Sequence, residues 1–272
     1  MDILLQALTL PMLGAGLWWG YRRWVSPHQE RLDPLGIGLL LLVILTLMGG
    51  FFGSPFWWMD EPRSFSWDLP PLASRMLAAA GWSFVALTFL ALQRPTPRRL
   101  RLTLLVLATY LVPLVLVILL FHLKDFDFAA PLTYAFFLLA GGMSLATLFY
   151  LLRQPAILPD DPEELLPPPP LVQGWLVAVG VITALWGAAL FATDSGPAPL
   201  IWVWPGDLLT SWLIAVMLFA IAVGAATSWR SAPLAHMMLA MATVYGLGLA
   251  LASGWNALLA KPIQPSYWWF LD

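Results

Sequence analysis

Long apolar runs alternate with short polar stretches along the whole chain, and eight of the runs contain no charged residue. Each run is 18 to 25 residues long, and about 20 apolar residues in a helix cross the hydrocarbon layer of a bilayer. The runs are Ile3–Tyr21, Leu35–Met59, Met76–Gln93, Leu102–Phe121, Phe128–Leu152, Leu171–Thr193, Leu208–Trp229 and Met237–Ala260. The pattern predicts an all-α integral membrane protein with eight transmembrane helices.

The composition agrees with a chain that lies in a membrane. Hydrophobic residues make up 60% of the 272 positions and charged residues 10%, whereas soluble domains carry about 25% charged residues. Cysteine is absent, which excludes disulfides, thiolate metal ligands and cysteine nucleophiles. The formal net charge is -2, and no block of basic residues indicates binding to nucleic acid.

Positive charge is divided unequally between the two sides of the predicted bundle. The loops after the first, third, fifth and seventh runs carry nine Arg residues, whereas the other side carries four Arg or Lys residues. Because Lys and Arg are retained on the cytoplasmic side, both termini are predicted outside the cytoplasm of a bacterial-type inner or plasma membrane. The nine are Arg22, Arg23, Arg31, Arg94, Arg98, Arg99, Arg101, Arg153 and Arg230; the four are Arg63, Arg75, Lys124 and Lys261.

The two halves of the sequence are weakly similar. A shift of 137 residues aligns Trp67 with Trp204, and two inserted residues then align Asp68 with Asp207. Four spans per half keep both halves in the same orientation, so the pattern predicts a parallel tandem repeat of two four-helix halves. The halves are 1–153 and 171–272, and the fifth helix, 128–152, belongs either to the first or to the start of the second repeat.

An acidic, Pro-rich segment, 154–170, is predicted to join the halves on the cytoplasmic side. Its four consecutive prolines, Pro167–Pro170, favour an extended polyproline II conformation because each lacks an N–H group. Two interpretations of the linker are open: a solvated spacer, or a docking site for a basic or aromatic surface of a partner.

The candidate site lies on the predicted outer face, where acidic and aromatic residues gather. Asp68 and Asp207 directly precede helices, where a carboxylate can cap free N–H groups. Arg75 either shares a helix face with Asp68, seven residues earlier, or extends its charged end toward water. The Trp residues form an aromatic belt at the headgroups or a surface on which a ligand ring stacks. The candidate ligand-binding residues are Trp67, Asp68, Arg75, His122, Asp125, Trp204 and Asp207.

The runs themselves contain no Asp, Glu, Lys, Arg or His. Ion-coupled transporters and retinal proteins place ionisable groups at membrane depth, and a haem held by two His needs both at one depth. His28, His122 and His236 all lie outside the runs, and no zinc-binding or phosphate-binding motif occurs. We therefore predict no catalytic residue, no metal site and no cofactor held by side-chain ligands. A lipid, quinone or pigment held by aromatic contacts is compatible with the sequence.

Pairs of glycines occur inside several runs, at Gly14 and Gly16, Gly49 and Gly50, and Gly141 and Gly142. Small residues let the backbones of membrane helices approach one another closely. We therefore interpret these pairs as helix contacts rather than as parts of a ligand site.

Two functions compete. The first is a non-catalytic accessory or structural subunit of a larger respiratory, photosynthetic or transport complex, whose partners are other integral membrane subunits and the lipid bilayer. It is favoured by short loops and by the lack of ionisable groups in the runs. The alternative is a stand-alone carrier or membrane enzyme that acts on an apolar or lipid-like substrate through the outer acidic and aromatic loops.

Overall fold

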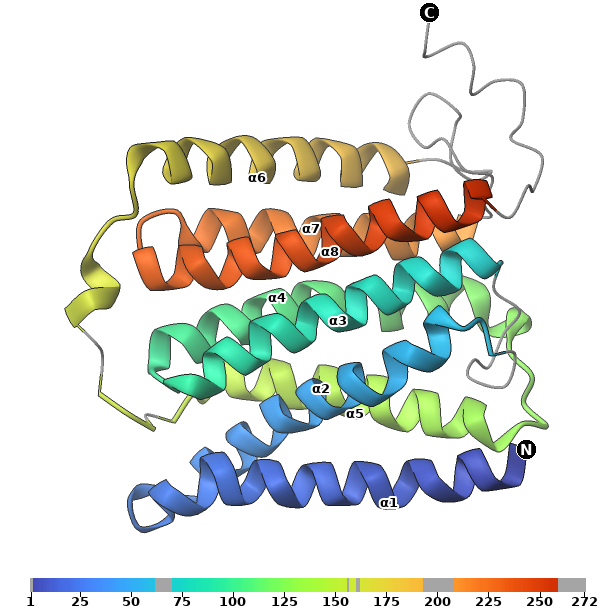
Figure 1. Cartoon of the computed structure of the whole chain (residues 1–272), viewed down its shortest axis with the longest axis horizontal. Helices are drawn as coiled ribbons and strands as arrows, with labels where there is room; N and C mark the ends of the chain where they lie inside the picture. Colours follow the sequence, from blue (N-terminus) through green and yellow to red (C-terminus); the bar gives the residue numbers. More distant parts are fainter. Residues whose placement is uncertain (1, 62–69, 156, 160–161, 193–207, 259–272) are drawn as a thin grey trace, which may run out of the picture.

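The computed structural model describes residues 2–61, 70–155, 157–159, 162–192 and 208–258, and this part of the chain is all-helical (Figure 1). Short π- or 3-10-helical turns join or extend the long helices. In chain order the elements are α1 (Asp2–Gly20), η1 (Tyr21–Val25), η2 (Ser26–Arg31), α2 (Pro34–Trp58), α3 (Pro71–Gln93), α4 (Pro97–Val117), η4 (Ile118–His122), η5 (Leu123–Asp125), α5 (Pro131–Leu152), η6 (Pro162–Leu165), α6 (Pro170–Phe191), α7 (Leu208–Ser228) and α8 (Ala232–Leu258).

Seven of the helices in the described residues are long and apolar enough to cross a membrane, which supports a multi-pass membrane protein. They are α2, α3, α4 continued through η4, α5, α6, α7 and α8. The expected first span also forms a helix, α1, of 19 residues.

The sequence explains where several helices begin. A proline stands at the first or second position of α2, α3, α4, α5 and α6, where its missing N–H group has no intrahelical partner to lose. Asp33 caps α2 by accepting a hydrogen bond of 2.6 Å from the N–H of Gly36. Thr96 caps α4 in the same way, accepting from the N–H of Arg99.

The centre of the bundle is formed by α3 and α7. α3 packs against α2 and α8, while α7 packs against α6 and α4. The largest buried cluster joins α3, α4, α7 and α8, and 72% of the α7 span is buried against 11% of the α5 span. Figure 1 shows the long helices running along one common direction, with α1 and α6 at opposite edges. α1, α5 and α6 therefore present broad apolar faces to the surroundings.

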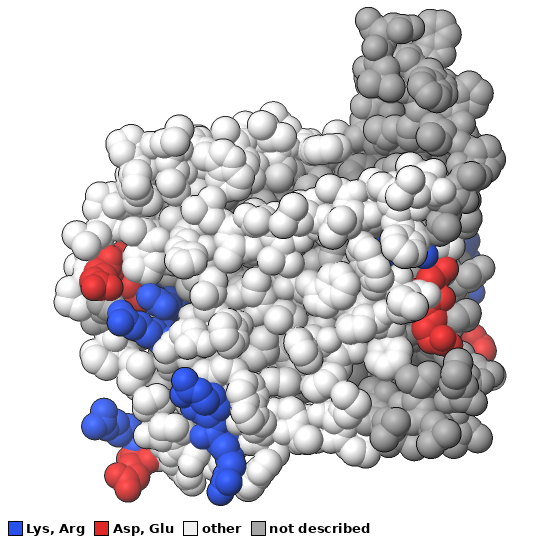
Figure 2. All heavy atoms as spheres, viewed as in Figure 1, with Lys and Arg blue, Asp and Glu red and all other residues white. Residues whose placement is uncertain are grey.

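Charged side chains gather at the two ends of the bundle. On the face shown in Figure 2, a broad band without Lys, Arg, Asp or Glu separates these ends. Most of the Lys and Arg atoms in this view lie at the end where α1 turns into α2 and α3 turns into α4. This distribution is the one that a bilayer-spanning bundle requires, because ionised groups stay near water.

The described part of the acidic segment between α5 and α6 packs onto the bundle rather than standing free in water. Ile157 is buried beside residues of α2, and the carbonyl of Leu166 accepts a hydrogen bond of 2.8 Å from the N–H of Ala232. The side chain of Glu164 is fully buried. Its Oε1 accepts from Thr96 Oγ1 at 2.6 Å and from Arg99 Nε at 2.9 Å. These contacts differ from the interpretation of the segment as a solvated spacer. They attach the segment to the start of α4 and of α8.

Candidate intramembrane binding site

Most of the outer cluster expected from the sequence lies outside the described residues. Trp67 and Asp68 fall within 62–69, and Trp204 and Asp207 fall within 193–207. The backbone of Asp125 belongs to η5. The proposal that these residues form a site with Arg75 and His122 therefore stays a prediction.

Arg75 and His122 are both buried at the end of the bundle opposite Glu164. Arg75 lies in the second turn of α3 with 9% of its surface exposed. It stands one turn before Ala79, which contacts Gly248 of α8, so it lies on the α8-facing side of α3. Within the described residues, its Nε has no hydrogen-bond partner. The imidazole of His122, at the end of η4, meets the indole of Trp212 edge-on at 5.5 Å.

The glycine pairs do not all serve close helix contact. A Cβ added at Gly50 would lie 2.7 Å from the carbonyl oxygen of Gly81, so α2 and α3 do approach closely there. Gly16 likewise stands against Met48 and Phe52 of α2. In contrast, a Cβ added at Gly49, at Gly141 or at Gly142 would meet no atom within 4 Å. The interpretation is confirmed for Gly50 and Gly16, and it is wrong for Gly14, Gly49, Gly141 and Gly142, where an added Cβ meets open space. Of these, Gly49 borders a cavity.

That cavity measures about 340 Å³ and lies between α2, α3, α4 and α5. Ligand-binding cavities commonly measure about 300–1,000 Å³. Small residues on α2, α3 and α5 leave the room, and aromatic rings form part of the wall. The small residues are Gly49, Gly50, Gly81, Ala135 and Ala140, and the aromatic ones are Trp57, Phe84, Tyr110 and Phe136.

Few polar groups line this cavity. The hydroxyl of Thr46 donates to the carbonyl of Leu42 at 2.9 Å and is thereby satisfied within its own helix. Tyr110, on α4, contributes a phenol and lies beside Phe84, with ring centroids 5.1 Å apart. Among the described lining residues none is Asp, Glu, Lys, Arg or His. The cavity therefore suits a neutral, largely apolar molecule.

A second cavity, of about 600 Å³, lies between α1, α2 and α3. Its lining is apolar and aromatic, with Trp19, Trp24, Phe51, Phe52 and Phe89 among its residues. Its apolar lining fits a hydrocarbon chain of the bilayer. A specific ligand needs a few placed polar groups for orientation. This cavity offers the indole N–H of Trp24, which has no hydrogen-bond partner among the described residues, whereas the α2–α5 cavity offers a phenol beside several aromatic rings and is the candidate developed below.

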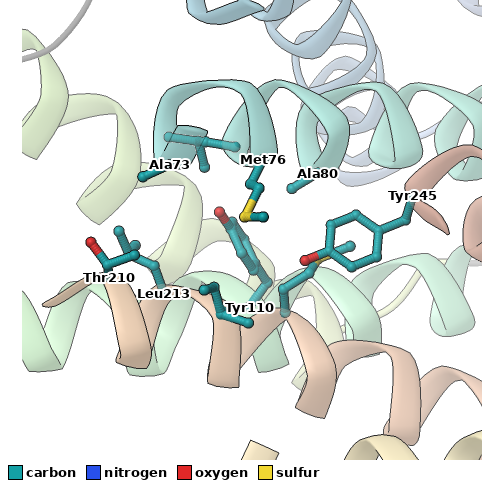
Figure 3. A pocket seen from close by; sticks show the side chains of 10 residues that line it. Ala73, Met76, Ala80, Tyr110, Thr210, Leu213 and Tyr245 are labelled. Carbon is teal, nitrogen blue, oxygen red and sulfur yellow. The ribbon is translucent and has the colours of Figure 1, made fainter. Parts of the chain in front are cut away.

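A third, small cavity of about 30 Å³ adjoins the α2–α5 cavity. Figure 3 shows Tyr110 of α4 and Tyr245 of α8 reaching into it from different helices, below Met76 and Ala80 of α3. Leu77, Tyr110 and Leu213 line both cavities, whereas Tyr245 lines the small one and not the larger one. Tyr110 is thus the polar residue at the junction of the two.

The sequence carried a partial signal for this site. Gly49, Gly50 and Gly81 stand out in apolar runs, but whether such a residue permits a helix contact or leaves a void depends on the neighbouring helix. Tyr110 is a single hydroxyl within an apolar run, and nothing in the run itself indicates what it faces.

The arrangement can hold an apolar molecule and offer it one phenol. Among the described residues, no group of three or more His, Asp or Glu could hold a metal ion. No family model matches the chain, and no curated protein or solved structure matches it either.

Proposed function

We propose that this protein binds an apolar, lipid-like molecule inside the membrane, in the cavity between α2, α3, α4 and α5. The observation that carries the proposal is the cavity itself, about 340 Å³, whose apolar and aromatic lining includes Tyr110. Dense packing is the normal state of a protein interior. A hollow of this size that reaches the exposed residues Gly49 and Leu139 is therefore filled by a molecule from the bilayer, and its lining favours a specific one. This is the carrier or lipid-handling alternative, with its site moved from the outer loops to the bundle interior.

The structure supports entry of the ligand from the bilayer. α2 and α5 make few contacts with each other, and Figure 1 shows α2 inclined relative to its neighbours. Gly49, which borders the cavity, is exposed. An apolar ligand can therefore pass between α2 and α5 without crossing the charged ends. Since the described lining lacks acids and bases, binding or carriage is favoured over catalysis.

A non-catalytic subunit of a larger membrane assembly is the second candidate. It is supported by the broad exposed faces of α5 and α6, which carry Leu138, Leu145, Leu171 and Leu185 at 67–85% exposure. Lipid chains can cover such faces, and another integral membrane subunit can cover them equally well. Native mass spectrometry of the purified protein separates the two: a bound lipid-like molecule on a lone chain favours the first, and unrelated partner chains favour the second.

The parallel repeat is also a proposal. In a repeat, α1 to α4 match α5 to α8 in order. The contact between α2 and α3 then matches the one between α6 and α7, and the contact between α3 and α8 matches the one between α7 and α4. An axis that relates the two halves requires both matches. The first helices of the halves differ, because α1 packs on α2 while α5 packs mainly on α4. We propose a duplication retained by α2–α4 and α6–α8 and modified at α1 and α5, in a bacterial-type plasma membrane with both termini outside.

The test fills the cavity from one position. Gly49→Leu adds a side chain into open space, so it should remove any co-purifying apolar molecule, measured by solvent extraction and mass spectrometry of the detergent-purified protein. The matched control is Gly246→Leu, on an exposed part of α8 where an added Cβ also meets no atom within 4 Å. The control should retain the molecule. Equal amounts in both variants, or none in the unmodified protein, would overturn the proposal.

A further inference from the structure

We infer that the ligand belongs to the quinone class, a flat neutral ring with an apolar tail, and that Tyr110 donates a hydrogen bond to a ring carbonyl. This inference rests on the proposed function of the α2–α5 cavity and adds the chemistry that the cavity selects. It begins with the two phenols at the centre of the bundle.

Tyr110 and Tyr245 are buried, with 8% and 5% of their surfaces exposed. Both residues line the small cavity between the helices (Figure 3). A buried hydroxyl without a partner is costly, so each hydroxyl requires a partner. The small cavity of about 30 Å³ accommodates one water molecule, which supplies a partner for Tyr245 (Figure 3).

Tyr110 differs from Tyr245 because it also borders the larger cavity. The other two residues shared by both cavities, Leu77 and Leu213, are aliphatic. The polar side chains of the α2–α5 cavity are Thr46, whose hydroxyl bonds within its own helix, Trp57 and Tyr110. Of these, only Tyr110 also lines the small cavity. A phenol donates its O–H, so the complementary group on the ligand is an acceptor such as a carbonyl oxygen.

The lining also selects the charge and shape of the ligand. A carboxylate or phosphate would be buried without a cation, since the described lining contains no Lys, Arg or His. Trp57, Phe84 and Phe136 provide aromatic surfaces, which favour contact with a flat conjugated ring. The exposed position of Gly49 between α2 and α5 leaves a way for a hydrocarbon tail to reach the bilayer.

The experiment uses the full chain in nanodiscs of phosphatidylcholine and ubiquinone-2 as the probe. The affinity is measured by titration against empty nanodiscs, and the carbonyl stretching band of the probe is followed by infrared difference spectroscopy. On the unmodified protein the band should move to lower frequency. Tyr110→Phe should weaken binding about fivefold, as loss of one hydrogen bond does, and should return the band to its free position.

Tyr245→Phe is the matched control, because its phenol does not line the larger cavity; it should leave affinity and band unchanged. A free-like band on the unmodified protein, or equal binding by Tyr110→Phe, would overturn the role of Tyr110. If ubiquinone-2 does not bind while another apolar molecule is lost in Gly49→Leu, the quinone class is wrong and the proposed function stands. If Gly49→Leu loses nothing, the proposed function fails and this inference with it.

Discussion

At the residue scale, the carboxylate of Glu164 holds together parts of the chain that are distant in sequence. Its two donors, Thr96 and Arg99, precede it by 68 and 65 residues, and the carboxylate is completely shielded from water. Removing one partner of a buried ion pair leaves an uncompensated charge and costs about 3–5 kcal/mol. Arg99→Ala should therefore lower the free energy of unfolding by about 3 kcal/mol, measured by denaturant unfolding in detergent.

A neighbouring ion pair supplies the control for this prediction. Arg94 and Glu163 lie 3.6 Å apart, with 59% and 68% of their side chains exposed. Exposed pairs contribute little because water screens them. Arg94→Ala should change the free energy of unfolding by less than about 1 kcal/mol, and equal losses in both Arg variants would contradict burial of Glu164.

The sequence indicated the charge of this segment but not its burial. Glu163 and Glu164 are adjacent acids in a Pro-rich stretch, which is typical of a solvated linker. Only Glu164 meets Arg99, and that pairing depends on how the α3–α4 turn lies against η6. The role of Tyr110 was hidden for the same reason, because cavities are bordered by several helices at once.

At the element scale, the α2–α3 contact depends on one of two adjacent glycines. A Cβ at Gly50 would lie 2.7 Å from the backbone oxygen of Gly81 and 2.9 Å from a methyl group of Val85. Gly50→Ala should therefore separate the helices and destabilise the protein by about 1–3 kcal/mol. Gly49→Ala meets no atom within 4 Å and should stabilise it by about 0.5–1 kcal/mol, because Ala favours helix more than Gly does.

Thermal unfolding of the two variants in the same detergent compares them directly. A larger loss for Gly49→Ala than for Gly50→Ala would show that the α2–α3 contact uses the other glycine. The pair is a strict comparison because the two positions are consecutive and both are helical.

Helix positions were well predicted because span length and hydropathy are local properties. The prediction placed the third and eighth starts at Met76 and Met237, whereas α3 and α8 begin at Pro71 and Ala232. The predicted spans were runs without charged residues or His, so they could not include Arg75 or His236. A helix can nevertheless continue past a charged residue into the headgroup layer. Helix partners could not be predicted in this way, because apolar runs carry little information on which face meets which neighbour.

At the scale of the whole molecule, the banded distribution of charge in Figure 2 and the excess of Arg at one end determine the expected orientation. The number of crossings in this orientation depends on α1, which has the length of a membrane span. With α1 across the membrane, both termini lie outside; without it, the N-terminus lies on the cytoplasmic side with the α3–α4 turn.

Single cysteines decide the crossing of α1, because the chain has none of its own. In intact cells, Asp60→Cys should react with an impermeant thiol reagent and Arg98→Cys should react only after the cells are opened, since positive loops stay in the cytoplasm. Asp2→Cys should behave like Asp60→Cys if α1 crosses. Shielding of Asp2→Cys together with labelling of Asp60→Cys would reduce the bundle to seven crossings, and labelling of Arg98→Cys in intact cells would invert the orientation. An inverted bundle would place Glu164 and its partners outside, while entry to the α2–α5 cavity from the bilayer would be unaffected.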